Sequence, residues 1–222
     1  TAANDRGQIV GWAENGVHDP TCDPAFQTLQ FRAVIWGPRG DMQELPPLPG
    51  DTTSAATAIN DQGQVVGISG DCGIAVGGVS ARQMVLWENG VPQRIDDLGG
   101  HTWNTPTAIN NDGVVVGFSL PLDQEGTINY RAFVWTKEDG INRLEEMPGT
   151  IRSQAWGINK RGQVVGRSDQ RPFLRRNGVM IQLETLPGAD EALPFAVNDH
   201  GSVAGQGQTA DGDDHAVAWL KK

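Results

Sequence analysis

The stretch I-N-D-Q-G-Q-V-V-G at residues 59–67 occurs, with small changes, five times in this chain. The other copies are A-N-D-R-G-Q-I-V-G at 3–11, I-N-N-D-G-V-V-V-G at 109–117, I-N-K-R-G-Q-V-V-G at 158–166 and V-N-D-H-G-S-V-A-G at 197–205. An internal repeat of this kind determines the architecture before any single element is considered. It also marks most of the conspicuous residues as scaffold, so a functional site is sought among the residues that are not repeated.

Each copy predicts a tight hairpin. The Asn side chain can accept a hydrogen bond from the backbone two residues later, and Gly supplies the left-handed conformation that a bulged turn needs. The short apolar run that follows, closed by a second Gly, is typical of a buried strand. The repeated turn residues are Asn4, Asn60, Asn110, Asn159 and Asn198, with Gly7, Gly63, Gly113, Gly162 and Gly201.

The residues around each hairpin predict two more strands and an innermost strand of small side chains. In the second copy these are residues 54–58, rich in Ala and Thr, then 83–87, which end in Trp, and 91–95. Four short antiparallel strands in a unit of roughly 40 to 55 residues are typical of a propeller blade. We therefore expect an all-β fold, a five-bladed β-propeller of four-stranded antiparallel blades.

The sequence also predicts how the blades are arranged along the chain. Residues 1–222 are expected to form a single propeller domain, with blades beginning near residues 1, 54, 104, 153 and 192. The last blade is expected to be incomplete, because the fifth unit stops before its fourth strand. The first unit begins almost at its turn, without an initiator Met or signal peptide, which suggests a processed or trimmed product.

Composition argues against some classes of partner. The net charge is -10 and the isoelectric point is about 4.7, whereas nucleic-acid binding and attraction to anionic membranes both require basic surfaces. No stretch of about 18 apolar residues suggests insertion into a membrane. We expect neither nucleic-acid binding nor membrane insertion. The sequence does not indicate the oligomeric state.

The combination of I-N-x-x-G-x-V-V-G, then R/H-A-F/V-x-W, then L-x-x-L-P-G resembles the HAF-repeat proteins, bacterial sequences described as probable extracellular repeats. Residues 131–133 (Arg-Ala-Phe) and 215–217 (His-Ala-Val) stand at the position of the His-Ala-Phe motif. The resemblance covers essentially the whole chain and implies an extracellular or cell-surface protein, with the periplasm as an alternative. It implies no reaction. The chain departs from the pattern at Gln83, where Arg or His is expected, and at Arg175, where Trp is expected.

The loops between the second and third strands differ in length from blade to blade, and they open on the face opposite the Asn turns. Variable loops on a rigid scaffold commonly carry binding sites. Cys22 and Cys72, the only cysteines, fall in these loops in adjacent blades. Two free thiols and one disulfide are both open at this stage, and the placement together with an extracellular setting favours the bridge.

Acidic residues cluster in two of these loops. Asp19 and Asp23 lie in the first, beside His18, and the last contains Asp211, Asp213 and Asp214, followed by His215. Since blades one and five are neighbours in a closed ring, the two groups are candidate calcium ligands or a pair of catalytic carboxylates. The alternative, which we favour, is that they are solvated turn-forming residues. No cofactor is otherwise expected, and no nucleophile motif or His-based metal motif is present.

Aromatic residues outside the repeated positions provide the candidates for ligand contact. Trp103 follows His101 in the connection between blades two and three. Trp156 lies on the innermost strand of blade four, where other units have Thr, and its polar neighbours are Arg152 and Gln154. Such an aromatic can stack on a sugar ring, or it can fill the channel. These five residues are our predicted ligand-binding candidates.

Three functions are compatible with the sequence. The first is a secreted non-catalytic binding module that recognises carbohydrate or an extracellular protein through the long-loop face. The second is a structural or assembly subunit of an extracellular structure. The third is a polysaccharide hydrolase or lyase that uses loop carboxylates. Because no catalytic motif is recognisable, we expect the first of these, with no catalytic residue assigned.

Overall fold

The computed structural model describes residues 1–73, 75, 80–99, 102–121 and 129–221, and everything described is strand, turn or loop. The strands form five antiparallel sheets in which each strand pairs with its neighbours in sequence.

Each sheet is one blade of the fold. Blade one contains β1 (Ala2–Ala3), β2 (Ile9–His18), β3 (Leu29–Trp36) and β4 (Met42–Leu45). Blade two contains β5 (Thr53–Ile59), β6 (Val65–Gly70), β7 (Gln83–Glu88) and β8 (Val91–Ile95). Blade three contains β9 (Thr102–Ile109), β10 (Val115–Pro121), β11 (Arg131–Thr136) and β12 (Gly140–Arg143). Blade four contains β13 (Ser153–Ile158), β14 (Val164–Ser168), β15 (Arg171–Arg176) and β16 (Val179–Gln182). Blade five contains β17 (Ala192–Val197), β18 (Val203–Gln208) and β19 (Asp214–Trp219).

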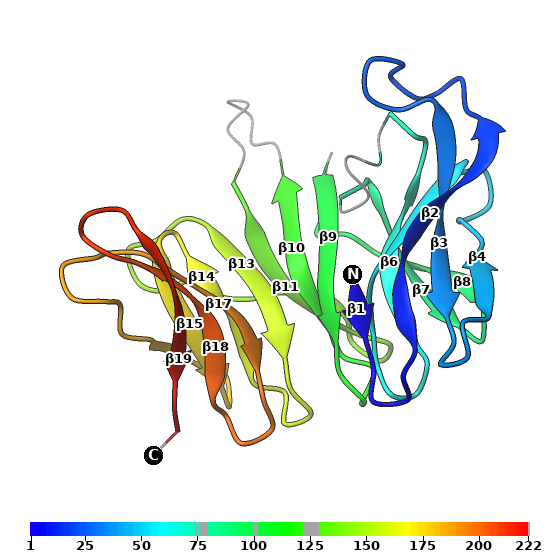
Figure 1. Cartoon of the computed structure of the whole chain (residues 1–222). Coiled ribbons are helices and arrows are strands. Elements are labelled where there is room, and N and C mark those ends of the chain that lie inside the picture. Colours follow the sequence, from blue (N-terminus) through cyan, green and yellow to red (C-terminus); the bar gives the residue numbers. More distant parts are fainter. Residues whose placement is uncertain (74, 76–79, 100–101, 122–128, 222) are drawn as a thin grey trace.

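These sheets confirm the predicted five-bladed propeller. The first strands of successive blades pack on one another, β1 on β5, β5 on β9, β9 on β13 and β13 on β17. In Figure 1 the blades follow one another around these inner strands, from β2–β4 at one side to β15–β19 at the other. The last blade has three strands and the first blade begins with a two-residue strand, as the truncated repeats predict.

The loop of blade one is shorter than the sequence suggested. The short apolar run of the repeat predicts a strand that ends at Gly11, with the loop starting at Trp12, but β2 continues to His18 and pairs with β3 as far as Leu29. A register irregularity between Glu14 and His18 lets the long hairpin extend beyond the blade.

The repeated Asn-x-x-Gly turns have the predicted geometry, and they also link the blades. Gly63 has a φ of 82°, and the side-chain Oδ1 of Asn60 accepts hydrogen bonds from the backbone N–H groups of Gln62 and Gln64, each at 3.0 Å. The Nδ2 of Asn60 donates to the carbonyl of Asn110 in the next blade, at 2.9 Å. The same donation joins Asn4 to Asn60, Asn110 to Asn159 and Asn159 to Asn198.

We expect Asn60→Ala to lower the free energy of unfolding by about 3 kcal/mol, because it leaves two backbone donors without partners at a buried site and removes the hydrogen bond to the carbonyl of Asn110 in the next blade. Asn198→Ala is the matched control. Asn198 caps the same turn, but its Nδ2 makes no hydrogen bond to another blade among the described residues, so a loss of about 1 kcal/mol is expected. Urea unfolding of both variants measures the difference, and equal losses would rule out the inter-blade link.

The second Gly of each repeat lies where two backbones approach closely. A Cβ on Gly67 would collide with the carbonyl oxygen of Ala55 and lie 2.9 Å from the Cα of Ala56. Gly117, Gly166 and Gly205 face the same obstruction in their own blades. The inner strand is bulged at this point, since the register shifts between Ala56 and Ala58. The residue at the bulge is Thr57, Thr107, Trp156 or Phe195, according to the blade.

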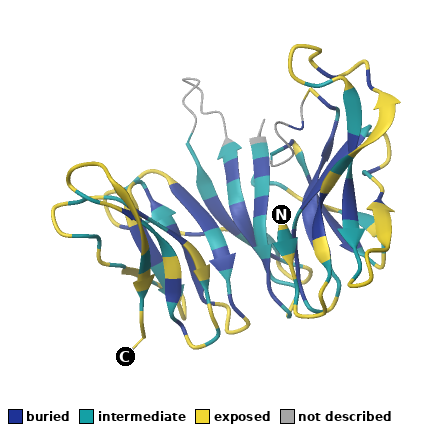
Figure 2. Cartoon of the chain, viewed as in Figure 1, coloured by how far each residue is buried: buried dark blue, intermediate teal, exposed yellow. Residues whose placement is uncertain are grey.

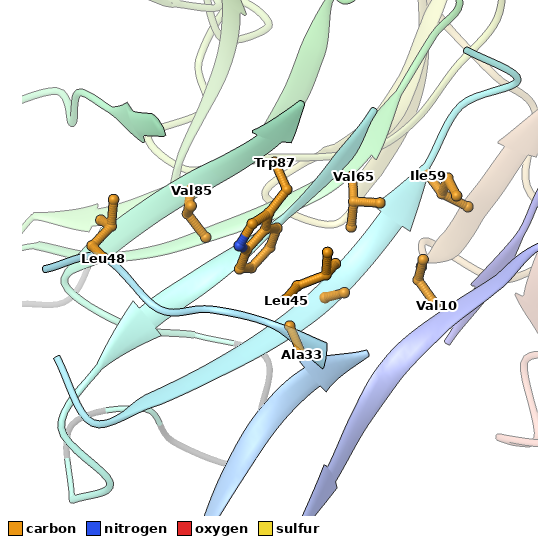
Figure 3. Close-up of a cluster of buried hydrophobic side chains, with 9 residues drawn as sticks. Val10, Ala33, Leu45, Leu48, Ile59, Val65, Val85 and Trp87 are labelled. Carbon is orange, nitrogen blue, oxygen red and sulfur yellow. The ribbon is translucent and has the colours of Figure 1, made fainter. Parts of the chain in front are cut away.

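The hydrophobic cores lie between neighbouring blades. Figure 3 shows the core between blades one and two, in which Val10 and Ala33 from one side meet Val65 and Trp87 from the other. Trp87 is 1% exposed, and its indole N–H donates to the carbonyl of Pro46 at 2.7 Å. Figure 2 shows buried positions concentrated in the middle blades and exposed ones on β19. The repeated Trp therefore packs one blade against the connection of the blade before it.

Candidate functional site

The long-loop face contains a disulfide between blades one and two. Cys22 and Cys72 are bonded, with their Cα atoms 4.6 Å apart, which confirms the bridge and removes the alternative of two free thiols. Thr21 reinforces the contact, because its hydroxyl accepts a hydrogen bond from the backbone of Cys72 and its carbonyl accepts one from Gly73. This part of the face is therefore covalently fixed.

The acidic loop residues beside the disulfide have a structural role that the sequence did not show. Asp19 is buried, and its Oδ1 accepts hydrogen bonds from the backbone and the hydroxyl of Thr21. Burial raises the pKa of this carboxyl, but hydrogen bonds from Thr52 and Thr21 and the charge of Arg32 outweigh burial and lower it overall. The carboxylate thus holds the turn that presents Cys22.

The five predicted metal ligands are not brought into one cluster. No group of three His, Cys, Asp or Glu residues within the described part of the chain has the geometry to hold a metal ion. Asp23 accepts a hydrogen bond from the backbone of Ala25, as a turn-forming Asp does. Asp211, Asp213 and Asp214 are exposed in the loop before β19 and at its start. Asp23 and these three residues therefore face solvent, whereas Asp19 is buried.

A groove of about 430 Å³ opens on the long-loop face where blades three, four and five meet. It brings together residues from four separate segments, and it includes two of the five predicted ligand-binding residues, Arg152 and Gln154. Its lining is formed by Tyr130, Ile151, Arg152, Ser153, Gln154, Arg167, Asp169, Gln170 and Glu191. Two guanidinium groups, two carboxylates and one phenol therefore line an open groove.

Arg167 is the central residue of the groove. Its Nε donates to the Oε1 of Gln154 at 2.8 Å, and its Nη1 donates to the Oε1 of Glu191 at 3.0 Å. The guanidinium lies over the ring of Trp156, 5.4 Å from the ring centroid, within the range of a cation–π contact. Trp156 in turn packs against Phe195 of blade five, with ring centroids 5.6 Å apart. These contacts fix the plane of the guanidinium and the position of the carboxylate.

Trp156 supports the groove. It occupies the bulged position of the inner strand, and the Arg167 guanidinium covers one of its faces. The sequence correctly placed this aromatic on the innermost strand beside polar residues. The expectation that its ring stacks on a sugar is not tested by the structure, which places Arg167 against the ring instead.

Asp169 anchors the other wall of the groove. Its backbone has a φ of 49°, an uncommon conformation for a residue other than Gly, which Asp tolerates better than most. Its Oδ1 accepts a hydrogen bond from the backbone N–H of Arg152 at 3.0 Å, and its own N–H donates to the Arg152 carbonyl at 2.8 Å. The backbone of Arg152 is therefore fixed, while its side chain is exposed at the groove.

The remaining predicted residues lie elsewhere. Trp103 is half-buried on β9, opposite Leu120 of β10, and it does not line the groove. His101 lies outside the described residues. Sequence reasoning missed Tyr130, Arg167, Asp169 and Glu191. Tyr130 is the single tyrosine, Arg167 lies on β14, and Asp169 and Glu191 lie in short connections between strands, so no common sequence signal marked these four residues.

A second carboxyl on this face is already satisfied within the scaffold. Asp51 accepts hydrogen bonds from the hydroxyl of Ser69 at 2.6 Å and from the amide of Gln83 at 3.1 Å. Burial raises the pKa of Asp51, and the hydrogen bond from Ser69 opposes that rise. Both contacts join the connection between blades one and two to blade two, so Asp51 stabilises the scaffold.

No protein-family model matches the chain, and no curated protein matches its sequence. Solved structures match over most of its length. A protein named as a candidate gluconolactonase is 14% identical, with a TM-score of 0.46 over 95% of this chain and 81% of the other. A streptogramin B lyase is 8% identical, with a TM-score of 0.41 over 97% and 88%. The virginiamycin B lyase of Staphylococcus aureus is 10% identical, with a TM-score of 0.40 over 97% and 90%.

These findings correct our functional expectation. The similar solved structures are named as enzymes, which contradicts the interpretation of this chain as a non-catalytic binding module. The likeness lies in the fold, and we do not transfer the reactions of those proteins to this chain. The described part of the chain contains no helix that could cross a membrane.

Proposed function

We propose that this protein is an enzyme that cleaves a polysaccharide, by hydrolysis or by elimination, in the groove between blades three, four and five. The observation that carries the proposal is the pairing of Glu191 with Arg167 in an open groove. Their side chains are 35% and 29% exposed, so a substrate can reach both. Either reaction needs a positioned proton-transfer group next to groups that hold the sugar, and this pair supplies both.

Each groove residue has a distinct part in this proposal. Glu191 transfers the proton, since its carboxylate is positioned by Arg167 and faces the groove. Gln154 positions Arg167 by accepting from its Nε. Asp169 positions Arg152 through backbone hydrogen bonds.

The cellular setting is part of the same proposal. The disulfide between Cys22 and Cys72 supports folding in an oxidising compartment, which we propose to be extracellular or at the cell surface. The ordered repeat motifs support membership of the HAF-repeat proteins as a further part of the proposal. Both suit an enzyme whose substrate is an extracellular polysaccharide.

The proposal is tested by incubating the protein with a panel of neutral and acidic polysaccharides and measuring the release of reducing ends. We expect cleavage of at least one substrate, and we expect Glu191→Gln to lower the rate about 100-fold or more because the proton-transfer group is lost. The substitution should leave the fold intact, since an exposed ion pair contributes at most about 1 kcal/mol.

Asp190→Asn is the matched control, because Asp190 is exposed, adjacent in sequence and absent from the groove lining. It removes the same charge and should retain the wild-type rate. Absence of cleavage across the whole panel, or a Glu191→Gln protein as active as the wild type, would show that the groove is not the active site of such an enzyme.

A further inference from the structure

Blade four is the basic part of an acidic protein. Residues 151–176 contain seven of the 17 Lys and Arg residues and one of the 27 Asp and Glu residues. The rest of the chain therefore has ten basic and 26 acidic residues. A local excess of positive charge on an otherwise negative surface concentrates anions at that place. Of these seven residues, Lys160 and Arg161 lie in the Asn turn on the opposite face, and the positive charge at the groove itself comes from Arg152 and Arg167.

Two of these basic residues lie in the groove with unused hydrogen-bond donors. The guanidinium of Arg152 is exposed and makes no ion pair among the described residues. Arg167 uses its Nε and Nη1, while its Nη2 makes no hydrogen bond within the described part of the chain. Planar guanidinium donors match the geometry of a carboxylate better than that of a sugar hydroxyl. The groove thus offers donors suited to an acidic group.

We infer that the groove takes an acidic polysaccharide, with Arg152 and Arg167 binding the carboxylate of a uronate residue while Glu191 removes the proton from the adjacent carbon. This inference rests on the proposed function and narrows it to elimination. Ion pairing with Arg152 and Arg167 withdraws charge from the sugar carboxylate, so the neighbouring C–H becomes more acidic. Glu191 lies beside one of these cations, where the base is needed.

The step balances without a cofactor or an oxidant. The C5–H bond of the uronate breaks and Glu191 takes the proton. The electron pair forms the C4–C5 double bond, and the glycosidic C4–O bond breaks. The leaving oxygen takes a proton from the hydroxyl of Tyr130, which lines the same groove, and becomes a free hydroxyl. One product has an unsaturated uronate at its new end, and the other has a hydroxyl where the bond was.

The inference is tested by calorimetric binding of an oligogalacturonate and of a neutral oligogalactan of equal length. Binding is measured on Glu191→Gln protein, so that the ligand is not consumed. We expect the acidic oligosaccharide to bind and the neutral one to bind at least tenfold more weakly. Arg152→Ala should weaken binding of the acidic ligand by roughly 10- to 100-fold, the range for a lost charged hydrogen bond. Arg152→Lys should restore part of it.

Arg176→Ala is the control for net charge, because Arg176 is exposed on β15 of the same blade and does not line the groove. It should change the affinity less than threefold. Equal affinities for the two ligands, or equal losses in Arg152→Ala and Arg176→Ala, would overturn the inference.

Product analysis separates this inference from the proposed function. With active protein and polygalacturonate, we expect an ultraviolet-absorbing unsaturated product, and Tyr130→Phe should slow its formation. Cleavage restricted to neutral polysaccharides would leave the proposed function standing and overturn the inference. Selective binding of the acidic ligand with no cleavage of any polysaccharide would uphold the ligand class and overturn the proposed function.

Discussion

Gly67→Ala is expected to lower the free energy of unfolding by about 4 kcal/mol or more, a large fraction of the stability of a typical domain. The new methyl group would meet the carbonyl oxygen of Ala55, with the Cα of Ala56 at 2.9 Å, and both obstructions are backbone atoms that cannot rotate away. Relief would require separating β5 from β6, which lie next to the core between blades one and two. Urea unfolding followed by circular dichroism measures the loss.

Gly63→Ala in the same repeat is the matched control. Gly63 has a φ of 82°, but the nearest atom to an added Cβ is a side-chain oxygen of Gln8 at 3.9 Å. This variant therefore carries only the cost of a left-handed residue, about 1 to 2 kcal/mol. If the two variants lost equal stability, or if Gly67→Ala folded as well as the wild type, the close approach of the two strands would not be the reason for the second Gly.

This pair of glycines shows what the sequence can and cannot reveal. The first Gly is required by the hairpin turn itself, which needs a positive φ at that position. The repeated motif alone was enough to predict this conformation. The second Gly is required by a bulge in the preceding strand, β5, whose backbone lies over it, and that geometry exists only once the sheet has formed. The propeller could be predicted because each blade repeats its local signals five times along the chain.

The links between blades were largely invisible in the sequence. The hydroxyl of Ser54 accepts a hydrogen bond from the backbone of Ala33 in the blade before it, and Ser153 does the same for Ala132. Ser69 accepts from Leu48 in the preceding connection, and Ser168 accepts from Met147. A Ser in a strand gives no sign that it will satisfy a backbone group of a neighbouring blade. These buried bonds can be recognised only once neighbouring blades are packed together.

Only the groove residues that blade four contributes near its inner strand could be predicted from the sequence. The sequence identified Arg152, Gln154 and Trp156 because they lie close together on one inner strand or just before it. Tyr130 comes from the strand entry of blade three, and Glu191 comes from the connection to blade five. Their meeting depends on the angle between blades, which no local pattern encodes. The acidic loops attracted attention by composition alone, although their carboxylates serve turns or face solvent.

Loss of the Cys22–Cys72 bridge is expected to lower the free energy of unfolding by about 4 kcal/mol. The two residues are 50 apart in sequence, and closing a loop of that length restricts the unfolded chain by about this amount in the chain-entropy account. For a chain of this size the melting temperature should fall by roughly 8 to 16 °C. The double variant Cys22→Ala with Cys72→Ala tests this by calorimetry, since both side chains lie in an apolar cluster where Ala is tolerated.

The wild type in reducing agent should melt like the double variant, whereas the double variant itself should not respond to reductant. An unchanged melting temperature in both comparisons would mean that the contacts of Thr21 hold the two loops without the bond.

The bridge joins blades one and two, but the groove is formed by blades three, four and five. Cleavage by the double variant well below its melting temperature should therefore match the wild type, and a large loss of activity there would mean that the site extends to the disulfide.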